Sequence, residues 1–192
     1  MHRRTILQKL AALPLAIVGA RAARAATKPT SPDIAAMQAN WKTLLASNAD
    51  VAPSRDPLKL SNDEWKKRLP PPAYSVLREE GTERPGSSPL NGEKRPGVFV
   101  CAGCSLPLFS SPMKYESGTG WPSFFTAIPD ALATTTDFKM ILPRTEYHCV
   151  RCGGHQGHVF DDGPKPTGLR YCNNGVALRF VSKEEKLPEL RT

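Results

Sequence analysis

The sequence has no apolar run of the roughly 20 residues that a helix needs to cross a bilayer, and neither an internal repeat nor a low-complexity tract. These absences argue against a membrane-spanning protein and against a repeat array. Aromatic residues make up only 7% of the chain, and only four histidines are present. Any chemistry that depends on imidazole therefore has few candidate residues.

The net charge of +8 gives little support to nucleic-acid binding once its distribution is considered. The first 25 residues contain five basic residues and no acidic residue, so the rest of the chain carries a net charge of only +3. Its 192 residues fit one domain, and a hydrophobic content of 40% argues against disorder. The 19 prolines indicate loops and turns rather than a helical bundle.

Residues 1–25 have the pattern of an export signal. Arg3-Arg4 is followed by an apolar stretch over 10–20, and Ala23-Arg24-Ala25 forms a small-x-small cleavage pattern. The segment 3–9 resembles the twin-arginine export motif, and an ordinary secretory signal or an uncleaved anchor is the alternative. We therefore expect a bacterial periplasmic protein without a stable membrane anchor. Because the twin-arginine pathway exports folded proteins, a metal could be loaded before export.

The remaining chain is predicted to be mainly β (α+β), with N-terminal helices and a small antiparallel sheet structure. We expect an N-terminal helix and linker over 26–60, the main domain over 61–183, and a tail over 184–192. Helices are predicted at 31–46, from the capping box Ser61-Asn62-Asp63-Glu64 to before Pro70, and at 73–79. Strands are predicted at 98–100, 138–142, 147–150 and 176–181.

Four of the five cysteines form two CxxC pairs, Cys101/Cys104 and Cys149/Cys152, with 44 residues between the pairs. Two such turns supply the four thiolates that Zn²⁺ prefers in structural sites. Gly153 suits the tight turn after the second pair. The pattern therefore predicts one structural zinc ion, whose closed thiolate shell has no open position for substrate.

Two other arrangements of these cysteines are possible. An exported protein could form two disulfides, although CxxC disulfides are more often reactive than structural. Cys149, Cys152, His155 and His158 could also form a zinc shell, which would leave the first cysteine pair without a partner.

Cys172 is the remaining cysteine and a candidate nucleophile. On a strand, Arg170, Cys172 and Asn174 point to one face, and a guanidinium lowers the pKa of a neighbouring thiol. The alternative is a buried, inert thiol. His155 and His158 precede this strand and could act as proton donors, or could be a surface histidine and a core histidine. Trp121, between Gly120 and Pro122, could form the wall of an apolar pocket or belong to the core.

Taken together, these motifs resemble the B-type methionine sulfoxide reductases over about 61–182. The motifs that carry the resemblance are Cys101-x-x-Cys104, Ser117-Gly118-Thr119-Gly120-Trp121-Pro122-Ser123-Phe124, Cys149-x-x-Cys152, His155-x-Gly157-His158-Val159-Phe160, Asp162-Gly163-Pro164 and Arg170-Tyr171-Cys172-x-Asn174. The resemblance implies two antiparallel sheets with a structural zinc opposite the active site. It also implies reduction of the R epimer of methionine sulfoxide, an oxidative lesion of Met side chains.

The resemblance also implies a role for each candidate site residue. Cys172 would attack the sulfoxide sulfur and become a sulfenic acid. His155 and His158 would bind and protonate the sulfoxide oxygen, and Asn174 would help to orient this network. Trp121, extended by Phe124, would form the wall for the substrate methyl group. Arg170, with Asp162 as its partner, would promote the thiolate.

Two departures from the family pattern are present. Many members have a resolving cysteine where this chain has Thr119, so an external thiol, such as a thioredoxin-like protein, would have to reduce Cys172 directly. Gly175-Val176-Ala177 replaces small hydroxyl residues, which puts local polar contacts there in doubt. We expect a monomer by default.

Two other functions compete with this interpretation. A non-enzymatic zinc-binding interaction module on the same fold would not need Cys172, Arg170 or the two histidines. A zinc-ribbon nucleic-acid binder would need a basic face, which Asp161, Asp162 and the modest charge after residue 25 do not favour.

Overall fold

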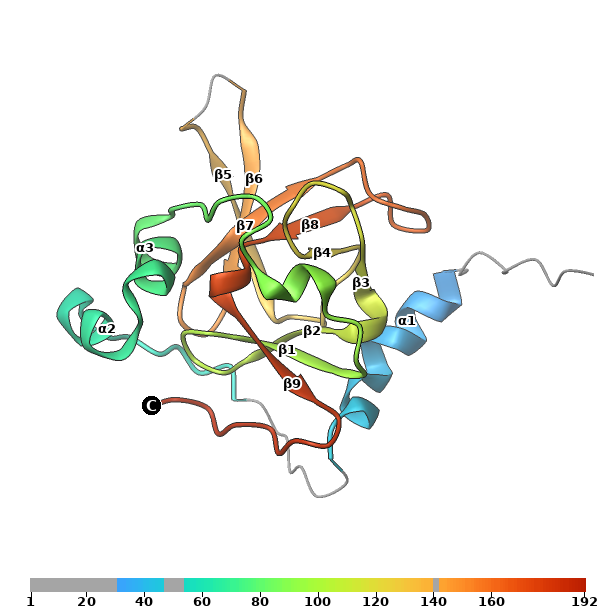
Figure 1. Ribbon diagram of the computed structural model, residues 1–192, viewed down its shortest axis with the longest axis horizontal. Helices are drawn as coiled ribbons and strands as arrows, with labels where there is room; N and C mark the ends of the chain where they lie inside the picture. The colour runs from blue at the N-terminus through green and yellow to red at the C-terminus, as the bar shows by residue number, and fades with distance from the viewer. Residues whose placement is uncertain (1–30, 47–53, 140–141) are drawn as a thin grey trace, which may run out of the picture.

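The computed structural model describes residues 31–46, 54–139 and 142–192, so the export signal expected at 1–25 lies outside the described residues. Two antiparallel sheets form the centre of the molecule, with helices beside them (Figure 1). The expectation of a mainly β fold with two small antiparallel sheets and N-terminal helices is confirmed. Within the described residues, no helix has the length and apolar character needed to span a membrane.

The first helix is shorter than the sequence predicts. The α-helix α1 covers Ser31–Ala39 and continues as the 3-10 helix η1 over Asn40–Leu44. Trp41 and Leu45 are buried in the main core, and the Gln38 amide donates hydrogen bonds to Thr126 Oγ1 and to the Ala127 carbonyl. This segment therefore packs on the sheet domain through apolar side chains whose spacing predicted the helix.

Two further helices, α2 (Asn62–Arg68) and α3 (Pro71–Glu79), precede the sheets. The predicted capping box is present, because Ser61 Oγ accepts from the Glu64 N–H and Glu64 Oε2 accepts from the Ser61 N–H. Pro71 begins α3, where its missing N–H costs no helical hydrogen bond, so the third helix starts two residues earlier than expected.

The smaller sheet has the strand order β2-β1-β9. Its strands are β1 (Gly97–Cys101), β2 (Pro107–Ser110) and β9 (Leu178–Ser182). The prediction at 98–100 is confirmed. The prediction at 176–181 is correct only from residue 178, because Gly175–Ala177 forms the 3-10 helix η4. Short 3-10 helices also cover Pro89–Gly92 (η2) and Ser111–Met113 (η3).

The larger sheet has the order β3-β4-β8-β7-β6-β5. Its strands are β3 (Lys114–Tyr115), β4 (Ser123–Phe124), β5 (Leu132–Asp137), β6 (Arg144–Cys149), β7 (His155–Phe160) and β8 (Arg170–Asn173). One face of this sheet meets the smaller sheet through Phe109, Phe124, Tyr147 and Tyr171, which are in ring contact.

The strand predicted at 138–142 is wrong. The chain is in β5 before this point, and the described residues 138, 139 and 142 lie at the end of the β5–β6 hairpin, outside any strand. Phe138 and Leu142 are 75% and 76% exposed. Their apolar character suggested a buried strand, whereas the true strand contains three consecutive threonines and gives no clear apolar alternation.

Candidate active site

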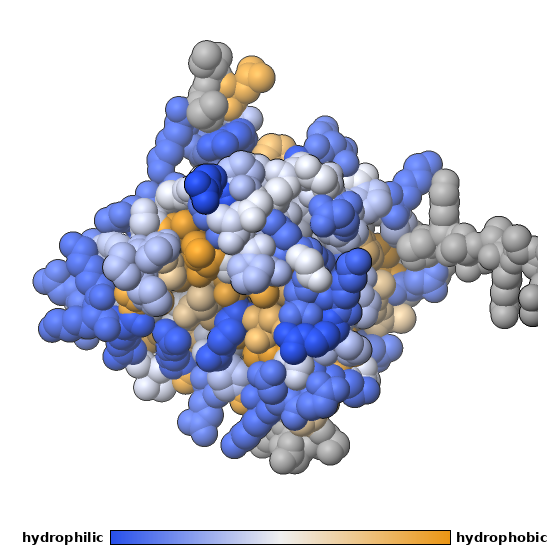
Figure 2. Space-filling model, in the orientation of Figure 1, coloured by the Kyte–Doolittle hydropathy of each residue, from blue (hydrophilic) through white to orange (hydrophobic). Residues whose placement is uncertain are grey.

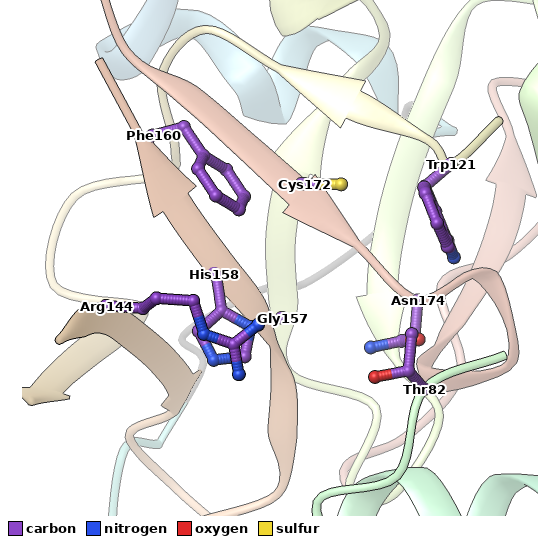
Figure 3. A pocket seen from close by; sticks show the side chains of 8 residues that line it. All are labelled: Thr82, Trp121, Arg144, Gly157, His158, Phe160, Cys172 and Asn174. Carbon is purple, nitrogen blue, oxygen red and sulfur yellow. The ribbon is translucent and has the colours of Figure 1, made fainter. Parts of the chain in front are cut away.

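A pocket of about 130 Å³ opens on the face of the larger sheet that points away from the smaller sheet. Its lining includes four of the predicted site residues and comes from several elements: Thr82, Trp121, Arg144, Gly157, His158, Phe160, Cys172 and Asn174. Figure 3 shows Cys172 between Phe160 and Trp121, with His158 and Arg144 on one side and Asn174 and Thr82 on the other.

The strand register places the reactive groups in one row across the sheet. Tyr115 pairs with Ser123, Ser123 with Cys172, Cys172 with His158, and His158 with Glu146. Directly opposite residues in antiparallel strands point to the same face, with Cβ atoms about 4.5–5.5 Å apart. Cys172 and His158 are therefore neighbours because β7 and β8 pair in this register.

A β-bulge brings His155 to the same face as His158. Residues three apart on a regular strand point to opposite faces. Here Tyr147 pairs with Gly157 but His148 pairs with His155, so Gln156 is the extra residue of the bulge. His155 is 3% exposed, its Nδ1 donates to Glu146 Oε1 at 2.7 Å, and its ring centroid lies 5.4 Å from that of His158. Its Nε2 is buried and has no hydrogen-bond partner in the described chain.

His158 reaches the pocket itself, and its Nε2 donates to Asp137 Oδ2 at 2.8 Å. Asp137 also accepts from Arg144 at 2.6 Å and from the Lys139 N–H at 2.8 Å. Burial lowers the pKa of His158 below its ordinary value of 6.5, against the opposing effect of the Asp137 hydrogen bond. His158 is therefore neutral at pH 7, with Nε2 engaged and Nδ1 available to accept a proton.

The surroundings of Cys172 shift the pKa of its thiol in opposite directions. Burial raises the pKa of its thiol above the ordinary value of 9.0, while the Arg170 guanidinium and the Thr119 hydroxyl act in the lowering direction. Arg170 is held by Asp162 through Nε and Nη2 hydrogen bonds of 2.7 and 2.8 Å, as the sequence suggested. The net direction differs from the expectation of a depressed pKa, because desolvation outweighs the neighbouring cation.

We expect Arg170→Met to raise the pKa of Cys172 further, because the substitution removes the cation that stabilises the thiolate. A shift of one unit would slow alkylation of Cys172 by iodoacetamide about 10-fold at pH 8. The rate should be measured from pH 6 to 10.5, with Arg179→Met on the distant strand β9 as the matched control. An alkylation midpoint that Arg170→Met leaves unchanged would show that the guanidinium does not act on the thiol.

Glu83 holds Asn174 and Trp121 in place and was not identified from the sequence. Its carboxylate accepts from the N–H groups of Gly175 (2.5 Å) and Val176 (3.1 Å) in η4. Its own N–H donates to Asn174 Oδ1 at 2.9 Å, and its carbonyl accepts from Trp121 Nε1 at 3.1 Å. Glu83, in the loop that follows α3, therefore fixes two sides of the pocket.

We expect Glu83→Ala to lower kcat/KM for the pocket's substrate by about 10- to 100-fold, because a displacement of about 1 Å of a group that contacts substrate can reduce the rate by about 100-fold. Glu83→Asp, which keeps the carboxylate, should recover part of the loss. Glu93→Ala, which removes an ion pair with Arg95 and a hydrogen bond from the Arg95 N–H, is the matched control. Equal losses for the alanine variants at positions 83 and 93 would argue against a positioning role.

Phe124 does not reach the pocket. It is fully buried and stacks on Phe109 with ring centroids 4.0 Å apart. Because Ser123 pairs with Cys172, the next residue, Phe124, faces the opposite side of the sheet and belongs to the core. Phe160, opposite Arg170 in the register, lines the pocket instead and lies under the Arg170 guanidinium at 4.3 Å.

Several other pocket residues were missed. Thr82 and Arg144 line the pocket, and Asp137 and Glu146 orient the two histidines. No short motif marks Asp137 or Glu146, because each lies on a separate strand and becomes a neighbour of a histidine only in the folded sheet. Asn173, next to the predicted Asn174, is buried and accepts a 2.8 Å hydrogen bond from the Tyr147 hydroxyl.

Four cysteines gather away from this pocket. The sulfurs of Cys101, Cys104, Cys149 and Cys152 all lie within 4.8 Å of one another and could hold a metal ion. The Cys101–Cys152 and Cys104–Cys149 sulfur distances are 3.7 and 3.5 Å. A tetrahedral site with Zn–S distances of about 2.3 Å has edges of about 3.8 Å, so the cluster fits a four-thiolate site.

The alternative cysteine arrangements do not agree with this geometry. The cysteines are free thiols, and the two histidines bind carboxylates rather than joining the cluster. Gly153 has φ +65°, as expected for the turn after the second pair. Cys101 ends β1 and Cys149 ends β6, so the cluster joins the two sheets.

Comparison with known proteins agrees with this combination of fold, cysteine cluster and cysteine–histidine pocket. Residues 69–182 match the model of the SelR domain family. A "Peptide methionine sulfoxide reductase MsrB" of Methanosarcina barkeri is 53% identical over 126 residues, 65% of this chain and 89% of the relative. "Peptide methionine sulfoxide reductase B1, chloroplastic" of Arabidopsis thaliana is 41% identical over 167 residues, 85% of this chain and 83% of the relative.

A "Peptide methionine sulfoxide reductase MsrB" of Pseudomonas putida is also 50% identical over 123 residues, 64% of this chain and 92% of the relative. The chain belongs to the MsrB family of peptide methionine sulfoxide reductases. The resemblance noted in the sequence is confirmed, and residues 69–182, which match the family model, lie within the range 61–183 expected for the main domain.

Proposed function

We propose that the protein reduces peptide methionine-R-sulfoxide to methionine through a Cys172 sulfenic acid. The observation that carries this proposal is the direct cross-strand pairing of Cys172 with His158 inside a pocket that Trp121 borders. The names of the relatives support the reaction and the oxidoreductase class.

The protonation states of the resting site suggest how the reaction proceeds. Cys172 is protonated because its pKa is raised, and His158 is neutral because its pKa is lowered. His158 accepts the thiol proton as Cys172 Sγ attacks the sulfoxide sulfur, and it then gives that proton to the sulfoxide oxygen. Arg170 stabilises the thiolate during attack.

The Sγ–S bond formed by the attack and the S–O bond of the substrate then break as the hydroxyl group passes to Cys172 Sγ. The step consumes one thiol and one sulfoxide and yields methionine and a Cys172 sulfenic acid, so no outside proton is required. Trp121 and Phe160 form apolar walls that suit the methyl group of the substrate, and Asn174 lies below Trp121, across the pocket from His158 (Figure 3). His155, held by Glu146, orients the polar network behind His158.

The experiment that tests this function compares peptides that contain only R- or only S-methionine sulfoxide, with dithiothreitol as reductant. We expect turnover of the R epimer alone, and a sulfenic acid on Cys172 that dimedone labels during turnover. Equal reduction of both epimers, or reduction of neither, would contradict the proposal.

An external thiol completes the cycle in this proposal. The family resemblance implies a resolving cysteine in many members at the position of Thr119, and the other four cysteines of this chain lie in the buried cluster. Two thiol groups of a reductant such as a thioredoxin-like protein convert the sulfenic acid to Cys172 thiol and water, forming one disulfide. Peptide mapping after turnover that finds Cys172 bonded to another cysteine of the same chain would contradict this step. The protein acts as a monomer in this scheme, which sedimentation equilibrium can test.

The cysteine cluster is proposed to hold one structural zinc ion. Its ligands would be Cys101, Cys104, Cys149 and Cys152, whose four sulfurs complete a closed shell. Zinc supplies cross-linking between the two sheets and takes no part in the reduction. Elemental analysis should find one zinc per chain; a different metal in purified protein would refute the assignment.

The proposed location of the activity is the bacterial periplasm, where the enzyme would repair oxidised exported proteins. The support is the basic, apolar and small-residue pattern of residues 1–25. Changing Arg3 and Arg4 together to Lys should block export by the twin-arginine pathway. Unaltered periplasmic fractionation of that variant would exclude this pathway.

A further inference from the structure

Arg144, the first residue of β6, is the only permanently charged side chain among the described residues that line the pocket. Hydrophilic side chains cover most of the molecular face in Figure 2, so an arginine on the surface is ordinary. An arginine in the wall of a pocket that contains a reactive thiol needs a different explanation. The guanidinium lies on the His158 side of the pocket (Figure 3), and the reaction proposed above leaves it without a role.

Two contacts with one buried carboxylate fix this guanidinium beside His158. Arg144 pairs directly with Asp137 in the β5–β6 register, and its Nη2 donates to Asp137 Oδ2 at 2.6 Å. The same oxygen accepts from His158 Nε2 at 2.8 Å, so the guanidinium and the imidazole are neighbours. The Asp137 side chain is only 7% exposed, which limits the movement of both groups.

The Arg144 guanidinium has a donor that no described residue uses. An arginine presents five N–H donors in a fixed planar fork, and Asp137 engages only Nη2. Nε is buried and has no hydrogen-bond partner among the described residues. Nη1 has no partner there either, and the Arg144 side chain is 34% exposed. Because Nε is enclosed by protein, Nη1 is the donor that a molecule in the pocket can reach.

Most other donors of the pocket are already engaged. His158 gives its only N–H to a carboxylate, so it can accept a proton but has none to give until it receives the thiol proton. Main-chain carbonyl groups accept one N–H of Asn174 and the indole N–H of Trp121. The Thr82 hydroxyl is a neutral donor. Arg144 is therefore the one charged donor available to a substrate oxygen in the resting pocket.

We propose that Arg144 is a catalytic residue whose Nη1 binds the sulfoxide oxygen of the substrate. This inference rests on the proposed function and adds the group that holds the oxygen before proton transfer. The sulfoxide oxygen carries partial negative charge, which increases as Cys172 Sγ attacks the sulfur. A fixed cationic donor at that oxygen stabilises the developing charge, and His158 then protonates the oxygen. Arg144 keeps its own protons, so the balance of the reaction is unchanged.

The first test compares kcat/KM for an R-sulfoxide peptide, with dithiothreitol as reductant, among wild type and variants of the full chain. We expect Arg144→Met to lower kcat/KM by about 100- to 1000-fold, the usual loss when one donor to a developing oxyanion is removed. Arg144→Lys, which keeps the cation, should recover part of the loss. Lys139→Met is the matched control, because it removes a cation that pairs with Glu80 outside the pocket, and it should stay within about twofold of wild type.

The second test separates contact with the oxygen from a structural effect, because Arg144→Met also releases Asp137. Fluorescence anisotropy measures binding of two short peptides, identical except that one contains methionine-R-sulfoxide and the other methionine, to protein that carries Cys172→Ser. We expect at least about 10-fold tighter binding of the sulfoxide peptide, as for a hydrogen bond from a charged donor. Adding Arg144→Met should remove most of this preference and leave binding of the methionine peptide unchanged.

Two outcomes of the binding test would overturn the proposal: a preference for the sulfoxide peptide that survives Arg144→Met, and equal weakening of both peptides. Arg144→Gln, which keeps a neutral donor, supplies the same comparison if Arg144→Met does not fold, and it should lose a smaller part of the preference. Binding requires no turnover. A sulfoxide preference that depends on Arg144 in a protein that reduces neither epimer would therefore refute the proposed reaction and still support the oxygen contact.

Discussion

Cys172→Ser is expected to reduce kcat/KM for peptide methionine-R-sulfoxide at least about 10³-fold, because the hydroxyl is a far weaker nucleophile than the thiolate and cannot form a sulfenic acid. Activity should be measured with excess dithiothreitol and with methionine formation quantified by chromatography. The row of Tyr115, Ser123, Cys172, His158 and Glu146 would otherwise remain intact.

The control for this variant is its stability. Cys172 lies outside the cysteine cluster, so the substitution should leave the melting temperature within a few degrees and the metal content unchanged. Activity on the R epimer that survives Cys172→Ser in a folded protein would refute the mechanism. Loss of metal in the same variant would show that the change disturbs more than the nucleophile.

Cys104→Ser is expected to unfold the domain or to lower its melting temperature by more than about 15 °C. Structural zinc contributes an apparent ~10–16 kcal/mol in zinc-finger peptides, which is comparable with the ~5–15 kcal/mol stability of a whole domain. Thermal unfolding followed by circular dichroism and elemental analysis measure the effect. Cys172→Ser, the same substitution outside the cluster, is the matched control.

Cys104→Ser could be insoluble, so the wild-type protein supplies a second measurement. Titration with a strong zinc chelator should release metal and unfold the chain over the same range of chelator concentration. Full retention of sheet structure after complete metal removal would contradict a structural role for the cluster.

The residues of the candidate site and of the cysteine cluster could be predicted from the sequence better than the positions of the strands could. The cysteine cluster was predictable because the CxxC spacing brings two thiolates close together, and two such pairs supply the four ligands of a tetrahedral metal site whatever the surrounding fold. Arg170 and Cys172 were correctly placed as neighbours because a spacing of two on a strand fixes their face. The family resemblance, rather than strand spacing, suggested Asp162 as the partner of that guanidinium, and the two side chains are hydrogen-bonded.

The wrong predictions share one physical cause. The local sequence pattern does not determine which strands pair, or in which register they pair. The polar strand β5 was missed because its edge position requires little apolar burial, and the exposed residues after it were mistaken for a buried strand. Phe124 was assigned to the pocket although the pairing of Ser123 with Cys172 turns it to the core. The clamp made by Glu83 joins segments about 40 and 90 residues apart, which no local motif shows.

The bulge residue Gln156 connects the two chemical centres of the domain. Its Nε2 donates to the sulfur of Cys101 at 3.4 Å, and its carbonyl accepts from the backbone N–H of Asn174 at 2.8 Å and from Asn174 Nδ2 at 3.1 Å. A single buried residue thus contacts both the cysteine cluster and an amide that lines the pocket. A displacement of Gln156 would therefore break hydrogen bonds at both places.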